Sequence, residues 1–557
     1  SFKDFDSCSV KFALSFPDLY EIGMSNLGVR IIYGLLNSIP QVVCERFFSV
    51  GSDMENILRS SGKEILSIDS GRKLGDFDII GFSLGSELNY TNVLNILELG
   101  KMPLKASMRH AEHPLVIAGG PCTLNPEPMH DFFDFFVIGE GEDVLLKIID
   151  VYSATRDVYK RGDIDRAEFL SAFDKLEGVY VPSFYEASYE NGEFHGLKPK
   201  KSKAKPFIKK TYVENLNQSY YPVRWLVPHV QVVHDRMAVE IMRGCPNRCR
   251  FCQARSQYYP LRYRSSDNIK NLSESIFCAS GYEELSLLGL SVGDYPRLKE
   301  LLTDLIMFFK VKGVAVSLPS LKSKSVLGEI SSLIGEIKKT GLTFAPEAGS
   351  ERMRNLLAKD FKCEEFFEVL KSAYSCGYQY VKLYFMIGLP NETTEDLDAI
   401  IDFALKVSNL RKEVGFPAAQ VNVSVSNFIP KPHTALQWLA MDSVDSITDK
   451  QRYLRDKFSK YKRIKISFHN PKMTALECIL SRGDRRLSEV ISEAFKSGAK
   501  FDAWSDCFNF DLWVSSFHAC GIDWKEYLRN KEPSGSLPWD LIDVGINKDI
   551  LIEEFYN

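Results

Sequence analysis

The chain has 557 residues, of which 45% are hydrophobic and 25% charged, a composition typical of globular proteins. This length is too great for one hydrophobic core and predicts about three or four domains. A net charge of −4 at pH 7 excludes a global attraction to nucleic acid or to an anionic membrane. No apolar run reaches the roughly 18–20 residues that span a bilayer, and no signal peptide is recognisable at the start, so we expect a cytoplasmic protein.

Residues 1–150 alternate between apolar strand patterns and helical patterns. Strands are predicted at 10–16, 76–84 and 114–120 and at the start of 135–150, with the first intervening helix at 23–39. This rhythm predicts a parallel, doubly wound, Rossmann-like sheet. Ligands of such sheets bind on the loops that follow the strands. Those loops are 17–23, 85–90, 119–128 and 139–142, which are rich in glycine and short polar residues.

Residues 151–233 interrupt this pattern and are interpreted as a linker with a small β element. A hairpin is predicted around Asn191-Gly192, because this dipeptide favours a tight two-residue turn. The run Lys198–Lys210 holds seven lysines in thirteen residues. Such runs are more often solvated linkers than binding sites, but an RNA substrate is left open here.

Residues 234–440 resume the β/α alternation. Six strand patterns, at 237–243, 284–290, 313–319, 342–348, 380–390 and 421–430, alternate with several amphipathic helical patterns. Six βα units suit a partial (β/α)6 barrel better than a closed eight-unit barrel. The remaining segment, 441–557, is predicted to form a mostly helical C-terminal domain.

The strongest chemical signal lies directly after the first strand of that series. Cys245, Cys249 and Cys252 have the spacing C-x3-C-x2-C, within EIMRGCPNRCRFCQARSQY. A four-iron cluster normally takes four thiolates, so three on one loop would leave one iron open for another ligand. Gly244 and Pro246 are expected to shape the turn. We expect Arg243, Arg248 and Arg250 to offset the cluster's negative charge.

Two simpler interpretations of the triad are a zinc loop and three unrelated thiols. His234 lies too far upstream to complete a short zinc knuckle, and no second Cys/His pair follows at zinc-ribbon spacing. The other nine cysteines are scattered and are expected to be buried or idle.

The triad, with an aromatic residue before its last cysteine and a six-unit barrel after it, resembles the radical SAM superfamily. The resemblance implies a [4Fe–4S] cluster whose open iron chelates S-adenosylmethionine (SAM) and which cleaves it to a 5′-deoxyadenosyl radical. It also implies a one-electron reductant such as a flavodoxin or ferredoxin. By position, the resemblance assigns SAM contacts to Gly289, Ser317, Glu347 and Gly388, although the Gly-Gly-Glu motif expected near Gly289 is degenerate. No catalytic residue is assigned.

The N-terminal domain resembles the cobalamin-binding (B12-binding) domain found in one class of radical SAM proteins. Those domains carry Asp-x-His-x-x-Gly, Ser-x-Leu and Gly-Gly on successive post-strand loops. The corresponding residues here are Asp18, Tyr20 and Gly23, then Ser86 and Leu88, then Gly119 and Gly120. Tyr20 replaces the histidine that would coordinate cobalt, and a phenol with a pKa near 10 is a poor cobalt ligand. The resemblance therefore implies cobalamin bound without a histidine lower ligand.

The whole chain is also similar to one group of B12-binding radical SAM proteins. The shared segments include FPDLYEIGMSNLG, GFSLGSELNYTN, IAGGPCTLNPEP, RGCPNRCRFCQA, FAPEAGSERMR and the closing RGDRRL, FDAW and PWDLIDVGI. The leading functional hypothesis is methyl transfer to an unactivated carbon, with cyclisation or ring rearrangement as an alternative use of the same cofactors. The substrate is not indicated.

Two further functional classes remain open. FIPKPHT at 428–434 is similar to methylthiotransferases, which hold a second cluster on three N-terminal cysteines, and Cys8, Cys44 and Cys122 are the candidates here. Cys8 and Cys44 do not fall on post-strand loops, which argues against that role. A sensor that holds cobalamin and a cluster without turnover is the third possibility.

Overall fold

The computed structural model describes residues 3–200, 204–317 and 341–557. Its N-terminal domain is built on a six-stranded sheet in the order β2-β1-β3-β4-β5-β6. The strands are β1 (Val10–Phe16), β2 (Val42–Phe48), β3 (Ile79–Ser83), β4 (Leu115–Gly119), β5 (Phe135–Val137) and β6 (Val179–Tyr180). All neighbours are parallel except β5 and β6. The strand order reverses at β1, so a crevice is expected at the carboxyl edge between β1 and β3.

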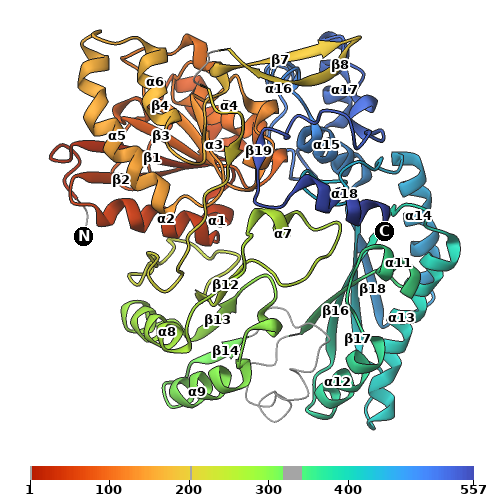
Figure 1. The fold of residues 1–557 in the computed structure, drawn as a ribbon. Coiled ribbons are helices and arrows are strands. Elements are labelled where there is room, and N and C mark those ends of the chain that lie inside the picture. The colour runs from red at the N-terminus through yellow and green to blue at the C-terminus, as the bar shows by residue number, and fades with distance from the viewer. Residues whose placement is uncertain (1–2, 201–203, 318–340) are drawn as a thin grey trace.

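Helices cover both faces of this sheet, which confirms the doubly wound prediction (Figure 1). The helices are α1 (Tyr20–Gly23), α2 (Leu27–Ser38), α3 (Ser52–Ser61), α4 (Tyr90–Leu99), α5 (Glu142–Lys160) and α6 (Arg166–Asp174). Helices α2 and α5 contact each other. Helices α3 and α4 are joined by hydrogen bonds from Asn95 and Arg59. The inner strands β4 and β5 are apolar along their length because both of their faces are buried, whereas the edge strand β2 carries Glu45 and Arg46.

The linker contains the expected hairpin. Strands β7 (Tyr185–Glu190) and β8 (Glu193–Pro199) pair antiparallel around Asn191 and Gly192. Both turn residues have positive φ, as this kind of turn requires. A second element, β9 (Ile208–Lys209), pairs with β19 (Ile542–Asp543) from the end of the chain, which ties the linker to the C-terminal region.

The second β/α series forms two parallel sheets that together make the partial barrel. The strands of the first are β10 (Met237–Glu240), β13 (Glu284–Leu288) and β14 (Ala315–Ser317), and those of the second are β15 (Leu342–Glu347), β16 (Tyr380–Ile387), β17 (Gln420–Asn427) and β18 (Ile464–Phe468). The outer helices are α8 (Ser266–Ser280), α9 (Leu298–Lys310), α12 (Cys363–Ser375), α13 (Thr394–Glu413) and α14 (Val444–Phe458). Figure 1 shows α8 and α9 on one flank and α13 on the opposite flank, with the strands between them.

The six predicted strands are present, although 318–319 of the third pattern lie outside the described residues. The sheet also continues into a seventh strand, β18, which lies beyond residue 440 and pairs with β17. The IKISF sequence of β18 alternates apolar and polar residues but is short, and Arg463 and His469 flank it.

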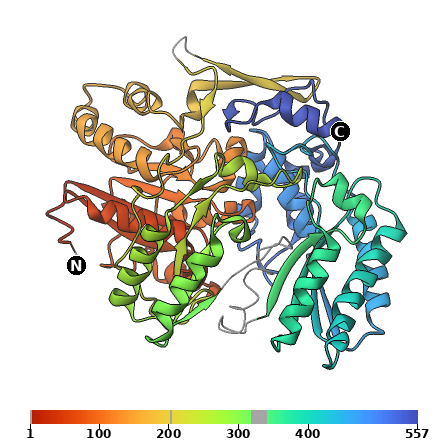
Figure 2. The ribbon, with the colours of Figure 1, turned by 60° about the horizontal axis from the view of Figure 1, so that its bottom comes forward.

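The C-terminal region is mostly helical and lies against the N-terminal domain (Figures 1 and 2). Its helices are α15 (Pro471–Arg482), α16 (Leu487–Lys496), α17 (Phe510–Ala519) and α18 (Lys548–Tyr556). Helix α16 contacts α4, and α15 contacts the short 3-10 turn at Glu87–Asn89. Of the helices in the described residues, none is both long and apolar enough to cross a membrane.

Candidate functional site

The cysteine loop leaves the first barrel strand through a sharp turn. Strand β11 (Met242–Arg243) pairs antiparallel with β12 (Arg262–Tyr263), and the loop between them ends in α7 (Gln253–Gln257). Gly244 has φ +87°, and a Cβ there would lie 2.8–2.9 Å from backbone atoms of Tyr258, Pro260 and Leu261. Only glycine fits this turn.

The three thiols of the loop are unbridged and lie near one another. The Asn247 amide donates a hydrogen bond to Cys245 Sγ at 3.3 Å, and the Cys252 N–H donates to the Cys249 carbonyl at 3.2 Å. Burial raises the pKa of Cys252, and the backbone N–H groups of Arg255 and Ala254 partly oppose that shift. Within the described residues no three His, Cys, Asp or Glu side chains converge on one metal ion. A four-iron cluster does not need that convergence, because each thiolate binds a different iron.

Arg243 is not available as a counter-charge for the thiols, contrary to the expectation from the sequence. Its guanidinium bonds Glu140, Glu142 and Glu240, each at 2.8 Å. Burial lowers the pKa of Arg243, but these carboxylates outweigh burial and raise it. Arg262 pairs with Glu140 as well, at 2.7 Å. The loop 139–142 therefore ties the N-terminal domain to the strand that begins the cysteine loop.

A different cation lies beside the thiols. Lys359 Nζ forms an ion pair with Glu347 at 3.1 Å, and their side chains are only 10% and 16% exposed. Burial lowers the pKa of Lys359, but the Glu347 carboxylate outweighs it, and the thiols of Cys249 and Cys252 add to the same upward shift. The loop before Lys359 is held by the Arg250 N–H, which donates to the Leu357 carbonyl at 3.0 Å. Nothing in the sequence pattern singled out Lys359.

The structure brings the four predicted SAM residues to the carboxyl ends of the barrel strands. Glu347 ends β15 at a β-bulge with φ +69°. Ser317 ends β14, and its hydroxyl donates to the Leu285 carbonyl at 3.4 Å. The Gly388 N–H donates to Glu392 Oε2 at 2.9 Å. Gly289 follows β13, where a Cβ would lie 2.6 Å from Met242 Cγ. Each has a local structural role, and their contact with SAM stays a prediction.

We call the seven residues predicted to contact cobalamin the cobalamin frame. Three of them contact other parts of the protein instead. Asp18 accepts a hydrogen bond from Trp504 Nε1 at 3.0 Å. The Tyr20 hydroxyl accepts one from the His229 N–H at 3.0 Å, and the two rings stack. A Cβ on Gly23 would lie 2.2 Å from the Phe48 ring, so this glycine serves packing. Their contact with cobalamin stays untested.

The other four residues of the frame divide into two pairs. The Ser86 hydroxyl caps a short turn by accepting the Leu88 N–H at 3.3 Å, and the Leu88 side chain is buried. Gly119 and Gly120 instead line a cavity of about 430 Å³.

This cavity, called the edge cavity below, opens at the carboxyl ends of β3, β4 and β5. It extends between the first turns of α2 and α5, and its floor is apolar. The residues of that floor are Phe12, Leu14, Ile31, Ile32, Phe82, Ile117, Ala118, Val137 and Leu145. A Cβ on Gly119 would meet nothing nearer than 3.9 Å, and one on Gly85 nothing within 4 Å. The barrel contributes Glu240, Arg243, Gln257 and Tyr258. The edge cavity and the cysteine loop are thus joined through Arg243.

Most of the remaining post-strand loops of the N-terminal domain contact the C-terminal region. Thr91 Oγ1 donates to Asp502 at 2.9 Å, and Arg485 Nε donates to Glu127 at 2.6 Å. The FIPKPHT segment packs here as well, because Lys431 pairs with Glu87 at 3.0 Å and His433 Nε2 lies 3.0 Å from the Leu124 carbonyl. The segments RGDRRL, FDAW and FIPKPHT therefore pack against the N-terminal domain.

The lysine run is partly internal. Lys205 Nζ donates to the Leu176 and Val179 carbonyls, and Lys209 pairs with Glu177 at 3.0 Å. Lys210 is buried, and its ammonium donates to the carbonyls of Ser256, Gln257 and Tyr259 just beyond the cysteine loop. Lys201 and Lys203 lie outside the described residues. Lys198 and Lys200 are exposed, and an RNA partner of the run stays a prediction.

The three N-terminal cysteines do not share one environment. Cys44 lies in β2 near Asp69 and Arg46, and Cys122 lies near Tyr90 and Glu87. Burial raises the pKa of both thiols. Cys8 is also buried.

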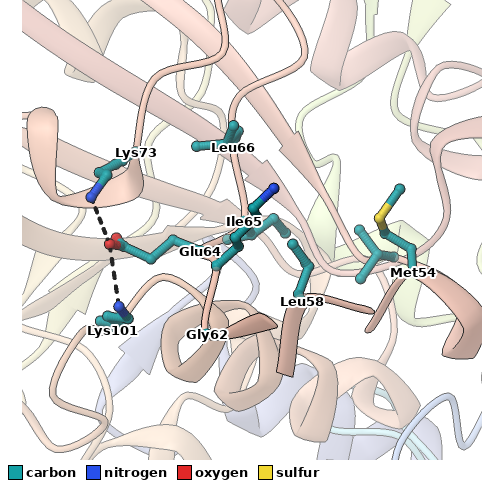
Figure 3. A pocket seen from close by; sticks show the side chains of 10 residues that line it. Met54, Leu58, Gly62, Glu64, Ile65, Leu66, Lys73 and Lys101 are labelled. Carbon is teal, nitrogen blue, oxygen red and sulfur yellow. Dashed lines mark hydrogen bonds and ion pairs between the residues drawn. The ribbon is translucent and has the colours of Figure 1, made fainter. Parts of the chain in front are cut away.

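A second cavity, of about 540 Å³, lies on the N-terminal domain beside α3 (Figure 3). Its wall is apolar, with Met54, Leu58 and Ile65. Its one carboxylate, Glu64, pairs with Lys73 at 2.9 Å and Lys101 at 3.6 Å. All lining residues fall within 50–101, so neither the barrel nor the cysteine loop contributes to this cavity.

Comparisons with known proteins agree with this architecture. The family model "Radical SAM proteins, N-terminal" matches residues 28–182, and "Radical SAM superfamily" matches 239–404. An uncharacterized protein of Methanocaldococcus jannaschii is 28% identical over 519 residues, covering 93% of this chain and 98% of the relative. An uncharacterized methyltransferase of Pyrococcus horikoshii is 24% identical, covering 53% of this chain and 59% of the relative.

More partial or distant similarities were also found. A tRNA-2-methylthio-N(6)-dimethylallyladenosine synthase of Syntrophomonas wolfei is 28% identical over only 30% of this chain and 40% of the relative. The solved structure of the cobalamin-dependent S-adenosylmethionine radical enzyme OxsB, with aqua-cobalamin and S-adenosylmethionine bound, covers 98% of this chain and 78% of that chain. Its TM-score is 0.50 and its identity 12%, so this likeness concerns the fold alone.

Proposed function

Because the chain belongs to the radical SAM superfamily, we propose that it is a cobalamin-dependent radical SAM enzyme that methylates an unactivated carbon. The observation that carries the proposal is the junction at Arg243. Arg243 lines the edge cavity, and its backbone leads directly into Gly244 and Cys245. A ligand in the cavity and a cluster on the loop would therefore be neighbours.

The cysteine loop fits a [4Fe–4S] cluster. It offers three thiols, is fixed at one end by the Gly244 turn, and has a buried cation, Lys359, within electrostatic reach of Cys249 and Cys252. A cluster with thiolate ligands carries negative charge, which this ammonium would offset. Glu347, Ser317, Gly289 and Gly388 remain the proposed SAM contacts, because all four lie at the same edge of the barrel.

The edge cavity fits the nucleotide tail of cobalamin. An apolar floor suits the benzimidazole ring, and the glycine rim permits close approach of a ligand. No histidine is among the described residues that line this cavity. We therefore propose cobalamin without a histidine lower ligand. In this proposal Gly119 and Gly120 contact the cofactor directly, whereas Asp18, Tyr20, Gly23, Ser86 and Leu88 support the loops around it.

When bound, the cluster with SAM would supply a 5′-deoxyadenosyl radical, and cobalamin would supply the methyl group. The part of this chain is to bind the two cofactors side by side and to keep water from the space between them. Lys359 and Glu347 fix the edge of the barrel beside the thiols, and the carboxylates around Arg243 fix the two domains relative to each other. A flavodoxin or ferredoxin is the proposed electron donor.

A methylthiotransferase-like activity is the second candidate, because relatives of that class match part of the chain. That activity would need a second cluster. Cys44 and Cys122 have different neighbours, which does not favour a shared site. Iron analysis separates the two candidates, since one cluster gives about four irons per chain and two give about eight.

The test is anaerobic reconstitution followed by iron, cobalamin and SAM-cleavage assays on the same sample. We expect about four irons and one cobalamin per chain. About eight irons would favour methylthiotransferase chemistry. Protein that cleaves SAM but retains no cobalamin would defeat the methyl-transfer proposal while leaving its radical SAM part intact.

A further inference from the structure

One face of the sheet β15–β18 carries long polar side chains that the proposed function does not use. On β16, Val381, Leu383 and Phe385 belong to the core that includes α12 and α13. The alternate residues point to the opposite, inner face of the barrel, because successive side chains of a strand alternate. There Tyr380 is 46% exposed and Tyr384 36%, and Lys382 between them is exposed as well.

The strand register places two lysines in one row across this inner face. Lys382 of β16 is the register partner of Asn422 of β17, which is in turn the partner of Lys465 of β18. All three side chains are exposed. Neighbouring strands lie about 4.8 Å apart, so the backbones of the two lysines are roughly 10 Å apart, with the amide between them. We call Lys382, Asn422 and Lys465 the lysine row.

The charges of this row are not neutralised within the described part of the chain. No described carboxylate forms an ion pair with Lys382 or Lys465, whereas the ammonium of Lys359 is paired with Glu347. The Lys382 ammonium instead lies over the Tyr384 ring, 4.7 Å from its centroid. Two unpaired ammonium groups that flank an amide are a suitable arrangement for an oxyanion, since all three groups donate hydrogen bonds.

The other sheet of the barrel carries short side chains at the corresponding inward positions. Ala238, Ser286 and Ser317 are register partners across β10, β13 and β14. The side chains that alternate with them, such as Val239 and Leu285, belong to the core shared with α8 and α9. Glu240 and Glu284 share that face by the same alternation, but their carboxylates pair with Arg243 at 2.8 Å and with Arg236 at 3.3 Å.

The row also lies at a defined level below the candidate SAM edge. Glu347 is the register partner of Phe385, which is three residues beyond Lys382 on β16. At about 3.3 Å per residue, the lysine row lies roughly 10 Å below Glu347 along the barrel. A ligand that spans this distance would present its far end to the carboxyl edge, where the cysteine loop begins.

We propose that the lysine row binds an anionic group, a phosphate or a carboxylate, of the substrate. The inference rests on the proposed function for the identity of the reacting end, but the anion site itself does not depend on it. The substrate class is then a molecule whose anionic group lies about 10 Å from the carbon that reacts.

The direct test is lysine footprinting of the cofactor-loaded enzyme. Acetylation by an N-hydroxysuccinimide ester is followed by mass spectrometry, with and without saturating inorganic phosphate or succinate. We expect Lys382 and Lys465 to react about tenfold more slowly with one of these anions, because a charge-assisted hydrogen bond must break first. Lys412, exposed on the outer helix α13, should react at an unchanged rate. Protection by phosphate alone indicates a phosphorylated substrate, and protection by succinate alone a carboxylate.

A pair of variants sharpens this test. Lys382→Gln should abolish the anion protection of Lys465, since the two ammonium groups would share one ligand, and Lys412→Gln should leave it intact. Absence of protection by both anions, or protection of Lys412 to the same degree, would overturn the inference. SAM cleavage by the same samples keeps the two proposals apart. Protected lysines without cleavage would reject the proposed chemistry and keep the anion site.

Discussion

The cysteine loop and the post-strand loops of the N-terminal domain both look like ligand loops in the sequence, but the structure uses them differently. The thiols of Cys245, Cys249 and Cys252 are unbridged, and their loop is held by backbone contacts. Asp18 and Tyr20, in contrast, are engaged by Trp504 and His229. A motif therefore locates a loop reliably, and whether that loop is free for a ligand depends on distant parts of the chain.

The largest expected effect is on the cysteine loop. Cys252→Ala should abolish the sulfur-to-iron absorbance, because the remaining two thiolates cannot hold the cluster. Cys507→Ala is the matched control, since Cys507 is exposed and remote in sequence, and it should retain full iron content. A Cys252→Ala protein with unchanged iron would contradict the assignment of the loop.

The second comparison is between a glycine that lines the edge cavity and a frame residue that does not. Gly119→Leu should weaken cobalamin binding at least about tenfold, because the new side chain would occupy space within the cavity. Asp18→Asn keeps the size of the side chain and should leave cobalamin affinity within about twofold. Equilibrium binding of cobalamin measures both. The reverse order of effects would show that the frame residues, and not the cavity, hold the cofactor.

A third effect is expected at the pair beside the thiols. Glu347→Ala leaves the Lys359 ammonium buried without a partner, a change that costs about 3–5 kcal/mol when a buried pair is broken. SAM affinity should fall while iron content stays near that of the unchanged protein. Lys359→Gln should instead lower the reduction potential of the cluster, because a positive charge near Cys249 and Cys252 is lost. If the reduction potential of the cluster were unchanged in Lys359→Gln, Lys359 would have a structural role only.

The smallest effect concerns the packing of FIPKPHT against the N-terminal domain. Burial lowers the pKa of His433 to about 4 from its ordinary value of 6.5, so the folded protein holds this ring neutral. As pH falls, His433 binds a proton in the unfolded chain before it does so in the folded protein. The stabilisation of the folded state by the neutral ring is therefore present above about pH 6.5 and is lost as pH falls toward 4. The loss should be about 1 kcal/mol between pH 6.5 and 5.5, and it should approach about 1.4 kcal/mol per pH unit in the middle of that window. Urea unfolding at pH 6.5 and 5.5 measures it, and His433→Gln should remove that share of the pH dependence.

Sequence patterns predicted the fold class, the N-terminal strands β1, β3, β4 and β5, and six barrel strands, because long apolar periodicities are set by local burial. They did not predict β2 or β6 of the N-terminal sheet. They missed β18, whose five residues are too few for a clear period. They also missed Lys359 and the lysine row, because a contact across the barrel depends on strand register and leaves no local signal. Arg243 was misassigned for the same reason, since its partners Glu140 and Glu142 lie about a hundred residues upstream.

The most direct test of the account is SAM cleavage by the reduced, cobalamin-loaded protein, measured as 5′-deoxyadenosine. We expect the unchanged chain and the Cys507→Ala control to form it, and Cys252→Ala to form none. Cleavage that persists in Cys252→Ala, or that is absent from an unchanged chain carrying a full complement of iron, would contradict the radical SAM activity proposed here.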